Sequence, residues 1–474
     1  MNESEKFEPV VIPLKQSIDA LTVFQRLNQL PHCLFLDSSA QDNRLGRYSF
    51  VTADPVDFIT AQVGDAGVFD DLEFRLTKYR AETIPGLPPF QGGLAGLWAY
   101  DFGREFEQIP VTKYREFSIP DLALGVYDVV VAFDHQENRA WIISQGYPET
   151  NPCGRVDVAE ARAEFFLKVI EGRTVSSSLQ KVCVEVPQLR REDLAPSFAT
   201  PYSDLLLSNF SHADYLDAVQ KCIDYIYAGD IFQVNLSQRL LYPAIDDAIA
   251  LYERLRTRNP APFSGFFDLG SHQIVSASPE RFIQVKDSQV ETRPIKGTRS
   301  RIGKTELDLY VGEALQHSEK DRAENVMIVD LMRNDLSRIC LPESVQVTEL
   351  CRLETYATVQ HLVSTVVGQL RDSATPIDLI KATFPGGSIT GAPKIRAMEI
   401  IAEMEPTARG AYCGALGYIG FDGTMDSSIL IRTVTAGQGW WQFPVGGGIV
   451  AQSDPQLEYE ETWHKAAGIL NSLK

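Results

Sequence analysis

Positive charge is in short supply in this sequence. Its 474 residues include 44 Lys and Arg against 63 Asp and Glu, which gives a formal net charge of −19 at pH 7. Binding to nucleic acid or to an anionic membrane surface would work against this overall field, so we expect neither as a partner. An anionic small ligand would have to be held by local basic side chains and backbone amides.

Cysteine motifs and long apolar runs are also missing. The seven cysteines show no C-x-x-C spacing, and their odd number argues against a disulfide framework or a structural zinc site. No run approaches the roughly 18 apolar residues that a membrane helix needs, and the N-terminal stretch MNESEKFEPVVIPLK has no apolar signal sequence. We therefore expect a cytoplasmic protein.

The sequence divides into three regions that differ in their pattern of apolar and polar residues. Residues 1–145 are expected to form mainly strands and turns, and LGVYDVVVAFD (124–134) with the following QENRAWIIS predicts a β-hairpin. A connecting segment is expected over 146–208, where a helical pattern gives way to sequence rich in Ser, Pro and Thr. From 209 to 474, longer helices alternate with strands. The composition, with 44% hydrophobic residues, is typical of an ordered globular protein.

One lysine occupies an unusual position. Lys296 lies within TRPIKGTRS (292–300), between a Pro-Ile pair and a Gly-Thr pair, with arginines on both sides. Lysines are almost always surface residues, so a solvated basic loop is one interpretation. A chemical role for the amine is the other.

The segment HSEKDRAENVMIVDLMRNDLSRI (317–339) predicts a helix with a carboxylate on its apolar face. Glu324 shares that face with Met327, Ile328 and Leu331. A buried carboxylate is costly unless a cation, a metal or a proton compensates it.

A second predicted helix, DPQLEYEETWHKAAGILNSL (454–473), places Glu458, Glu461 and Lys465 on one face. This spacing suits a site, and it equally suits ordinary ion pairs on an exposed helix. If the two helices converge, several carboxylates meet without enough fixed positive charge. A hard divalent ion such as Mg²⁺, which takes one or two protein carboxylates plus water and substrate oxygens, would relieve that repulsion.

Glycine-rich segments suggest an anion site near the C-terminal end. In TFPGGSITGAPKIRAMEIIAEMEP (383–406) a glycine turn precedes an amphipathic helix, whose free amides would attract an anion; a plain turn is the alternative. Arg432 lies among apolar residues of CGALGYIGFDGTMDSSILIRTVT (413–435), where it needs either a core salt bridge or a ligand carboxylate. Tyr418 would share a sheet face with Arg432 only if the hairpin loop around Asp422-Gly423 has an odd number of residues.

Several stretches together resemble the chorismate-utilising enzymes. In the C-terminal region they are GDIFQVNLSQR, SASPERF, PIKGTR, DRAENVMIVDLMRNDL, TFPGGSITGAPK, RTVTA and YEETWHKA. In the N-terminal region, LFLDSS, GRYSF, ADP and GGLAGLWAYD resemble the part shared by the large subunits of anthranilate synthase and aminodeoxychorismate synthase. The resemblance implies an α+β fold, a large four-layer α/β sandwich in which helices flank two extended, mainly antiparallel sheets.

Two positions distinguish branches of this family. Gln233 stands where isochorismate and salicylate synthases carry a lysine that activates water, which implies ammonia as the nucleophile. Lys296 replaces the alanine typical of anthranilate synthases and is similar to the lysine of aminodeoxychorismate synthases. The resemblance thus implies conversion of chorismate and ammonia to 4-amino-4-deoxychorismate, for para-aminobenzoate and folate synthesis. Anthranilate synthase and a non-catalytic sensor of chorismate or tryptophan are the alternatives.

The resemblance also implies roles for individual residues. Lys296 would add to C2 of chorismate while Glu280 protonates the departing C4 hydroxyl, with Gln233 and His361 beside the ring. Mg²⁺ would be held by Glu324 and Glu461 with Glu458 close by. The residues implied to position the substrate are Thr390, Gly391, Ala392, Tyr418, Arg432, Gly446, Gly447 and Lys465.

These roles require opposite pKa shifts in one site. A nucleophilic lysine must be neutral although its ordinary pKa is about 10.4, and burial and the nearby Arg293 or Arg299 would lower it. Glu280 must stay protonated near neutral pH, which calls for an apolar setting or neighbouring carboxylates.

The resemblance implies two further partners. Because the regions described leave no segment of glutaminase size, a glutamine amidotransferase subunit is expected to deliver ammonia within a heterodimer. The stretches LDSS and NPAPF (259–263) match portions that form a tryptophan pocket in this family. Whether tryptophan binds here is left open, and the residues implied for that pocket are Asp37, Ser38, Arg47 and Pro262.

Overall fold

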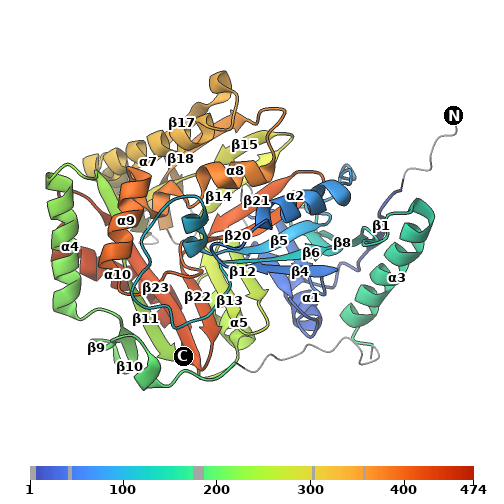
Figure 1. Ribbon diagram of the computed structural model, residues 1–474, viewed down its shortest axis with the longest axis horizontal. Coiled ribbons are helices and arrows are strands. Elements are labelled where there is room, and N and C mark those ends of the chain that lie inside the picture. The colour runs from blue at the N-terminus through green and yellow to red at the C-terminus, as the bar shows by residue number, and fades with distance from the viewer. Residues whose placement is uncertain (1–6, 41–44, 174–185, 302–304, 356–358) are drawn as a thin grey trace.

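Two large antiparallel sheets organise the computed structural model, which describes residues 7–40, 45–173, 186–301, 305–355 and 359–474 (Figure 1). The larger sheet has 13 strands among the described residues. In spatial order these are β1 (Val10–Pro13), β8 (Arg139–Ser144), β7 (Val129–Asp134), β3 (Tyr48–Thr52), β2 (Leu34–Asp37), β12 (Phe263–Asp268), β13 (Gln273–Ser278), β22 (Thr433–Gly437), β23 (Trp440–Ile449), β11 (Gln233–Pro243), β10 (Ser203–Ser208) and β9 (Phe198–Thr200), with β19 (Gly391–Ala392) also paired to β11.

The smaller sheet has 10 strands in the same part of the chain. Their order is β16 (Ile295–Ser300), β18 (Val359–Gln369), β15 (Gln289–Thr292), β14 (Arg281–Lys286), β21 (Met425–Ile429), β20 (Ala415–Gly420), β5 (Gly93–Trp98), β6 (Leu122–Tyr127) and β4 (Asp57–Ala61), and β17 (Gln346–Thr355) pairs with β18. The predicted pair of extended antiparallel sheets is confirmed.

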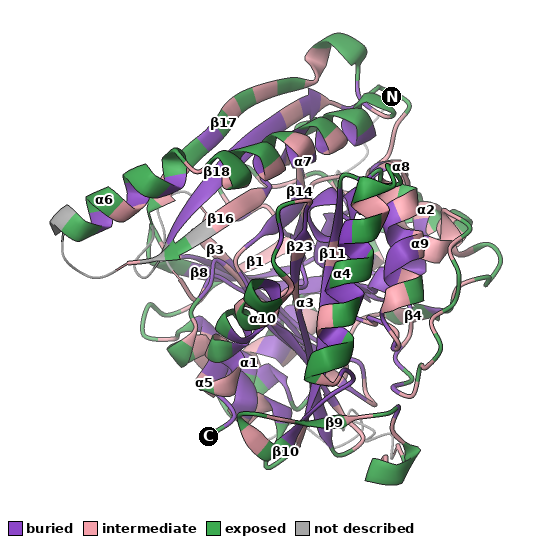
Figure 2. Cartoon of the chain, turned by 90° about the vertical axis from the view of Figure 1, so that its left-hand side faces the viewer, coloured by how far each residue is buried: buried purple, intermediate pink, exposed green. Residues whose placement is uncertain are grey.

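Helices cover the outer faces of both sheets. They are α1 (Ala20–Leu27), α2 (Val68–Lys78), α3 (Pro152–Ile170), α4 (His212–Tyr227), α5 (Ala248–Arg258), α6 (Thr305–Gln316), α7 (Glu319–Ser337), α8 (Pro376–Thr383), α9 (Lys394–Met404) and α10 (Pro455–Leu470), with short 3₁₀ turns η1 (Tyr100–Glu105), η3 (Arg191–Asp193), η4 (Pro342–Ser344) and η5 (Gly387–Ile389). Helices α1, α3 and α5 pack on the larger sheet and α6 and α7 on the smaller one. Figure 2 shows the buried inner and exposed outer faces of these helices.

Strand β6 shows why the sequences of the strands are continuous runs of apolar residues. Its alternate residues Leu122, Leu124 and Val126 enter the core under the helices, whereas Ala123 and Tyr127 enter the core between the sheets. Both faces of the strand are therefore dry, and the polar alternation of a half-exposed strand is lost.

The run 124–134 is divided between the sheets. It was predicted as one strand, but β6 ends at Tyr127 in the smaller sheet and β7 begins at Val129 in the larger one. Asp128 at the junction is fully buried and pairs with Arg162 of α3 at 3.1 Å. The hairpin prediction holds for β7 and β8, which pair from Val129 opposite Ser144.

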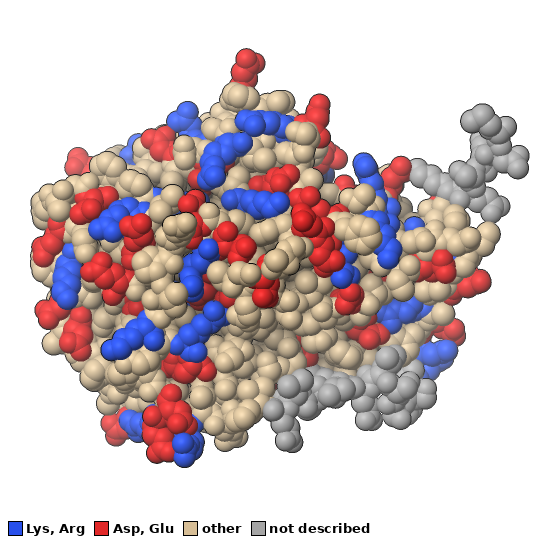
Figure 3. Space-filling view, viewed as in Figure 1, with Lys and Arg blue, Asp and Glu red and all other residues tan. Residues whose placement is uncertain are grey.

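The N-terminal region (residues 1–145) and the C-terminal region (residues 209–474) both contribute strands to each sheet. Phe35 of the N-terminal region lies opposite Phe266, and Gly96 lies opposite Gly417. The connecting segment 146–208 contributes α3, β9 and β10 rather than a bare linker. No described helix combines the length and apolarity that crossing a membrane demands. Acidic and basic side chains intermingle on the face shown in Figure 3.

Candidate active site

The chain passes between the two sheets beside the predicted acid and the predicted anchor. Glu280 stands between β13 in the larger sheet and β14 in the smaller sheet, and Arg432 stands between β21 and β22, which belong to the smaller and larger sheets. The Ile429 amide donates to the Glu280 carbonyl at 3.1 Å, and the Ala277 amide donates to the Arg432 carbonyl at 3.1 Å. The two crossovers therefore run side by side. They bring together Glu280 and Arg432, which lie 152 residues apart in the sequence.

Lys296 points its amine into the site from β16. Its Nζ donates to the carbonyl of Ser388 in η5 at 3.1 Å. Burial lowers the pKa of Lys296, against the raising effect of Glu324 and Glu280. The alternative of a solvated basic loop is therefore wrong.

The predicted help from neighbouring arginines is also wrong. Arg293 donates to Glu354 at 2.5 Å, and Arg299 pairs with Asp321 at 3.1 Å. Burial comes first among the influences on the pKa of Lys296, and Lys465 is the cation that lowers it further.

Glu280 carries the opposite pKa shift. Its residue is 5% exposed, and burial raises the pKa of its carboxyl, while Ser388, Lys296 and the amide of Ile295 partly lower it. The Oε1 atom finds no hydrogen-bond partner among the described residues. The two neighbouring groups thus have pKa shifts in the directions that an acid and a nucleophilic amine require.

The two acidic helices converge. Lys320 in the first turn of α7 pairs with Glu458 of α10 at 3.2 Å, and the Ser453 hydroxyl donates to the same Glu458 oxygen at 2.6 Å. Glu461 pairs with Lys465 at 2.7 Å within α10. The Glu461–Lys465 pair by itself is an ordinary ion pair within one helix, as one alternative predicted. Glu458 differs, because it is buried and its carboxylate contacts Lys320 of the other helix.

Glu324 lies beside this cluster and has no hydrogen bond or ion pair within the described part of the chain. Burial raises the pKa of its carboxyl, while Lys296 and Lys320 lower it. Glu324 itself is half-buried, and Ile328 on the expected face is fully buried.

The backbone of β23 leaves room next to these carboxylates. A Cβ atom at Gly447 would lie 3.2 Å from Nζ of Lys465, 3.4 Å from Oε1 of Glu461 and 3.6 Å from Oε2 of Glu458. Gly446 presents its carbonyl to Lys465 at 2.8 Å. A side chain at 447 would fill the space that a ligand needs.

These residues fit a hard divalent cation. Within the described ranges no three His, Cys, Asp or Glu residues already form a metal-holding group. Oxygens of Glu458 and Glu461 nevertheless face the same space beside Gly447, and Glu324 supplies a half-buried carboxylate that has no hydrogen bond or ion pair among the described residues. One or two carboxylates, completed by water and substrate oxygens, are what Mg²⁺ requires.

Arg432 has the properties of an anion anchor. Its φ of 52° is a left-handed conformation that non-glycine residues rarely adopt, and burial lowers the pKa of its guanidinium. Its side chain makes no ion pair with any described residue, so the core salt bridge that was one alternative is not formed there.

His361 of β18 lies near Arg432. It is 3% exposed, and burial, followed by the charge of Arg432, lowers its pKa to about 4. The ring is therefore neutral at physiological pH.

Gln233 closes another side of the site. It is fully buried at the start of β11, and neither its amide nitrogen nor its amide oxygen has a partner among the described residues. It pairs across the ladder with Ala392, and at Gly391 a Cβ would come within 2.2 Å of the Gln233 carbonyl oxygen. The glycine is thus required for this close approach.

The expectation for Thr390 needs revision. Its amide donates to the Gly387 carbonyl at 3.3 Å and its hydroxyl to the Gly386 carbonyl at 3.0 Å. Its backbone amide is therefore already engaged and is not a free donor for an anion.

Comparison with known proteins identifies the family. A family model described as chorismate binding enzyme matches residues 31–471. The chain belongs to the chorismate binding enzyme family. It is 40% identical to the aminodeoxychorismate synthase component 1 of Salmonella typhimurium over 98% of both chains.

Two further relatives show how close the branches of the family lie. The chain is 40% identical to the anthranilate synthase component 1 of Thermus thermophilus, over 83% of this chain and 80% of that one. The solved anthranilate synthase component I of Streptococcus pneumoniae superposes with a TM-score of 0.74 at 31% identity, covering 90% of this chain and 93% of that one. Overall identity alone does not separate the two activities.

Tyr418, which the family resemblance placed at the substrate, lies elsewhere. Its ring stacks on Phe90 at 4.3 Å and borders a second cavity of about 1010 Å³ between the sheets. The alternation argument that tied Tyr418 to Arg432 does not apply, because Arg432 follows the end of β21 and belongs to a crossover. Tyr418 lines the second cavity and Arg432 does not, so the two side chains do not belong to the same site.

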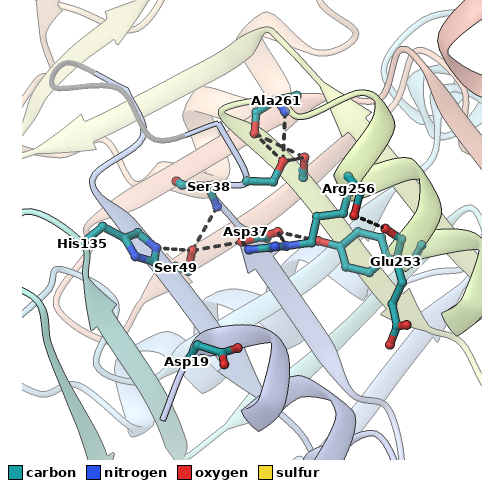
Figure 4. Close-up of polar contacts among 12 residues, drawn as sticks. Asp19, Asp37, Ser38, Ser49, His135, Glu253, Arg256 and Ala261 are labelled. Atoms are coloured by element: carbon teal, nitrogen blue, oxygen red, sulfur yellow. Dashed lines mark hydrogen bonds and ion pairs between the residues drawn. The ribbon is translucent and has the colours of Figure 1, made fainter. Parts of the chain in front are cut away.

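The second cavity gathers the residues implied for tryptophan. Asp37, Ser38, Arg47 and Pro262 all line it. Asp37 accepts from Arg256 at 2.7 Å, Ser38 donates to the Tyr48 carbonyl at 2.6 Å, and Arg47 pairs with Asp134 at 2.7 Å. Figure 4 shows the contacts that run from His135 through Ser49 and Asp37 to Arg256. Tryptophan binding stays a prediction.

Two participants were missed from the sequence. Ser388 accepts from Lys296 through its carbonyl, and no spacing in the sequence signals that contact. Lys320 could have been found, because it lies four residues before Glu324 and thus on the same helical face.

Proposed function

We propose that this chain is the chorismate-converting component of an aminodeoxychorismate synthase. It would convert chorismate and ammonia to 4-amino-4-deoxychorismate, which leads to para-aminobenzoate and folate. The observation that carries this proposal is the half-buried amine of Lys296 beside the buried carboxyl of Glu280, with pKa shifts in opposite directions. An alanine at 296 could not supply that amine.

The first half of the reaction uses both groups. The neutral Lys296 amine adds to C2 of the ring, both conjugated ring double bonds shift, and the C4–oxygen bond breaks. Glu280 donates its proton to the departing hydroxyl, which leaves as water. The raised pKa of Glu280 keeps that proton available, and the lowered pKa of Lys296 keeps the amine's electron pair available.

The second half restores the enzyme. Ammonia adds to C4, both ring double bonds shift back, and the bond between C2 and the lysine nitrogen breaks with return of the electron pair to Lys296. The new ammonium group loses a proton to the carboxylate of Glu280, which is thereby protonated again. The enolpyruvyl group is retained, and the balance is chorismate plus ammonia to aminodeoxychorismate plus water.

Gln233 supports ammonia over water as the incoming group. Its buried amide is neutral and cannot remove a proton from water as a lysine base would, yet both of its polar atoms are open to hydrogen bonding with a small molecule. Ammonia can both donate to the amide oxygen and accept from the amide nitrogen.

The substrate's negative charges would be met by fixed groups of this chain. Arg432 and Lys465 supply positive charge, and Gly447 leaves the space in which a carboxylate can approach. Glu324, Glu458 and Glu461 would hold Mg²⁺, which when bound supplies charge that neutralises the ring carboxylate. The neutral His361 would donate or accept a hydrogen bond without adding charge.

Ammonia would come from a glutamine amidotransferase subunit. The name component 1 carried by the relative from Salmonella typhimurium points to a multi-component enzyme. We therefore propose that this chain works in a heterodimer and also accepts free ammonia in vitro. Tryptophan is proposed as the occupant of the second cavity, and equilibrium dialysis with labelled tryptophan tests this point independently of catalysis.

Product analysis tests the function. The protein is incubated with chorismate, ammonium chloride at pH 8.5 and MgCl₂, and the products are separated and identified by mass. Aminodeoxychorismate without release of pyruvate is expected. Anthranilate together with pyruvate would contradict the proposal, and no consumption of chorismate under any condition would favour a sensor.

A further inference from the structure

Lys320 is the one cation that joins the two acidic helices among the described residues of this cluster. Its Nζ lies 3.2 Å from Oε1 of Glu458, although its own side chain is 44% exposed. Burial lowers the pKa of Lys320, but Glu458, Glu324 and Glu461 together raise it above its ordinary value. The amine is therefore charged and faces inward from the edge of the site.

The other cations of the cluster are differently placed. Lys465 is held within α10 by Glu461 and by the carbonyl of Gly446, so it has two fixed partners. Lys296 must be neutral to react. Lys320 alone reaches across from α7, and in the described structure its hydrogen bond goes to Glu458.

Lys320 contacts Oε1 of Glu458, a proposed metal ligand, whereas Oε2 of the same carboxylate faces the space beside Gly447. Glu458 is 5% exposed, and a buried carboxylate next to Glu324 and Glu461 is repelled unless a cation lies near it. A lysine ammonium is a strongly hydrated point charge on a flexible stem, so it can leave such a carboxylate and return to water at little cost. Its half-exposed side chain leaves that route open.

We propose that Lys320 is a displaceable counter-ion, which stabilises Glu458 in the metal-free enzyme and whose charge the divalent cation replaces. It is a positioning residue, because it acts through Glu458 and touches no reacting atom. This inference rests on the proposed magnesium site. Its consequence is that Lys320 competes with the metal and weakens metal affinity.

Metal titration of Lys320→Met tests the proposal. Mn²⁺ is used as the probe, and free Mn²⁺ is followed by electron paramagnetic resonance with the full-length protein in ammonia-free buffer. Removal of the competing charge is expected to tighten Mn²⁺ binding about tenfold. Lys320→Arg keeps the charge and is expected to bind Mn²⁺ no more tightly than the wild type.

Lys168→Met is the matched control. Lys168 is 42% exposed and pairs with Glu164 at 3.0 Å on α3, away from the acidic helices. Its replacement is expected to leave Mn²⁺ affinity unchanged. Unchanged or weaker Mn²⁺ binding by Lys320→Met would overturn the proposal, because a residue that merely orients Glu458 would lower affinity when removed.

A thermal measurement gives a second readout. Without metal, Lys320→Met is expected to melt below the wild type, since three carboxylates lose a counter-charge, and added Mg²⁺ is expected to raise its Tm by more than it raises that of the wild type. An equal rise in both proteins contradicts the role of Lys320. If the wild type binds no Mn²⁺ with or without chorismate, the magnesium proposal fails as well, which separates the two failures.

Discussion

Lys296 shows how strongly one residue's surroundings decide its chemistry. Lys296→Ala removes the amine but leaves Arg432, Lys465 and the acidic helices in place. We expect aminodeoxychorismate formation to fall by orders of magnitude, while chorismate still binds with similar affinity. Single-turnover assays and calorimetric titration with chorismate measure the two quantities separately, and turnover that survives the substitution would assign the lysine a purely electrostatic role.

His361 gives a pH dependence at the same scale. Its pKa is about 4 in the folded chain against 6.5 for the ordinary value, so between these limits the unfolded chain binds more protons than the folded one. The part of the folding stability that comes from this pKa difference is therefore fully present above pH 6.5 and is lost as the pH falls toward 4. Compared with His361→Gln, the wild type should lose about 1 kcal/mol more on going from pH 7.5 to pH 5.5. Urea unfolding at the two pH values measures this difference, with His464→Gln on the exposed face of α10 as the control.

Residue types and motifs were enough to assemble most of the site. The convergence of the acids of α7 and α10 was considered from their positions on two helices, whereas Glu280 and Lys296 were placed together by the family resemblance. Tyr418 was grouped with Arg432 by resemblance, yet it lies in the second cavity. The engagement of Arg293 with Glu354 was also invisible, since partners 61 residues apart leave no local signal.

At the scale of elements, the junction between β6 and β7 depends on one ion pair. Arg162 of α3 contacts Asp128 at 3.1 Å and Asp54 at 2.5 Å, and Asp128 is wholly buried. Arg162→Met leaves two carboxylates without their cation, so we expect a loss of about 3 kcal/mol in the free energy of unfolding. The double variant with Asp128→Asn should recover part of that loss.

Chemical denaturation measures the effect of Arg162→Met. Lys168→Met, on the same helix but exposed, should change stability little. A loss as small as that of the control would mean that water enters and solvates Asp128. The division of the run 124–134 between sheets could not be predicted, because both faces of each strand are apolar and only the buried Asp128 marks the junction.

At the scale of the whole molecule, neither the N-terminal nor the C-terminal region can complete a sheet by itself. Strand β12 needs β2 as a neighbour, and β20 needs β5. A fragment comprising 209–474 is therefore expected to lack a cooperative unfolding transition and to expose apolar strand edges. Circular dichroism and dye binding check this expectation, and coexpression with 1–208 should restore a cooperative transition. A fragment that melts cooperatively alone would show that the regions are independent.

The sequence boundaries at 145 and 208 reflected a change in the pattern of apolar and polar residues, whereas the structure mixes the strands of both regions. Pairing between strands hundreds of residues apart requires tertiary information that hydrophobic periodicity does not contain. The fold itself was predictable through the family resemblance, which supplied the two antiparallel sheets.

The crossovers that carry Glu280 and Arg432 have a consequence for how such an enzyme can diversify. Both residues occupy positions where the chain leaves one sheet for the other, so only their backbone carbonyls, and not their side chains, take part in pairing with neighbouring strands. Exchange of the side chain at either position, the proposed proton donor or the proposed anion anchor, is therefore expected to leave strand pairing intact. Substitutions at these two crossovers can therefore change the chemistry of the site while the surrounding sheets stay the same.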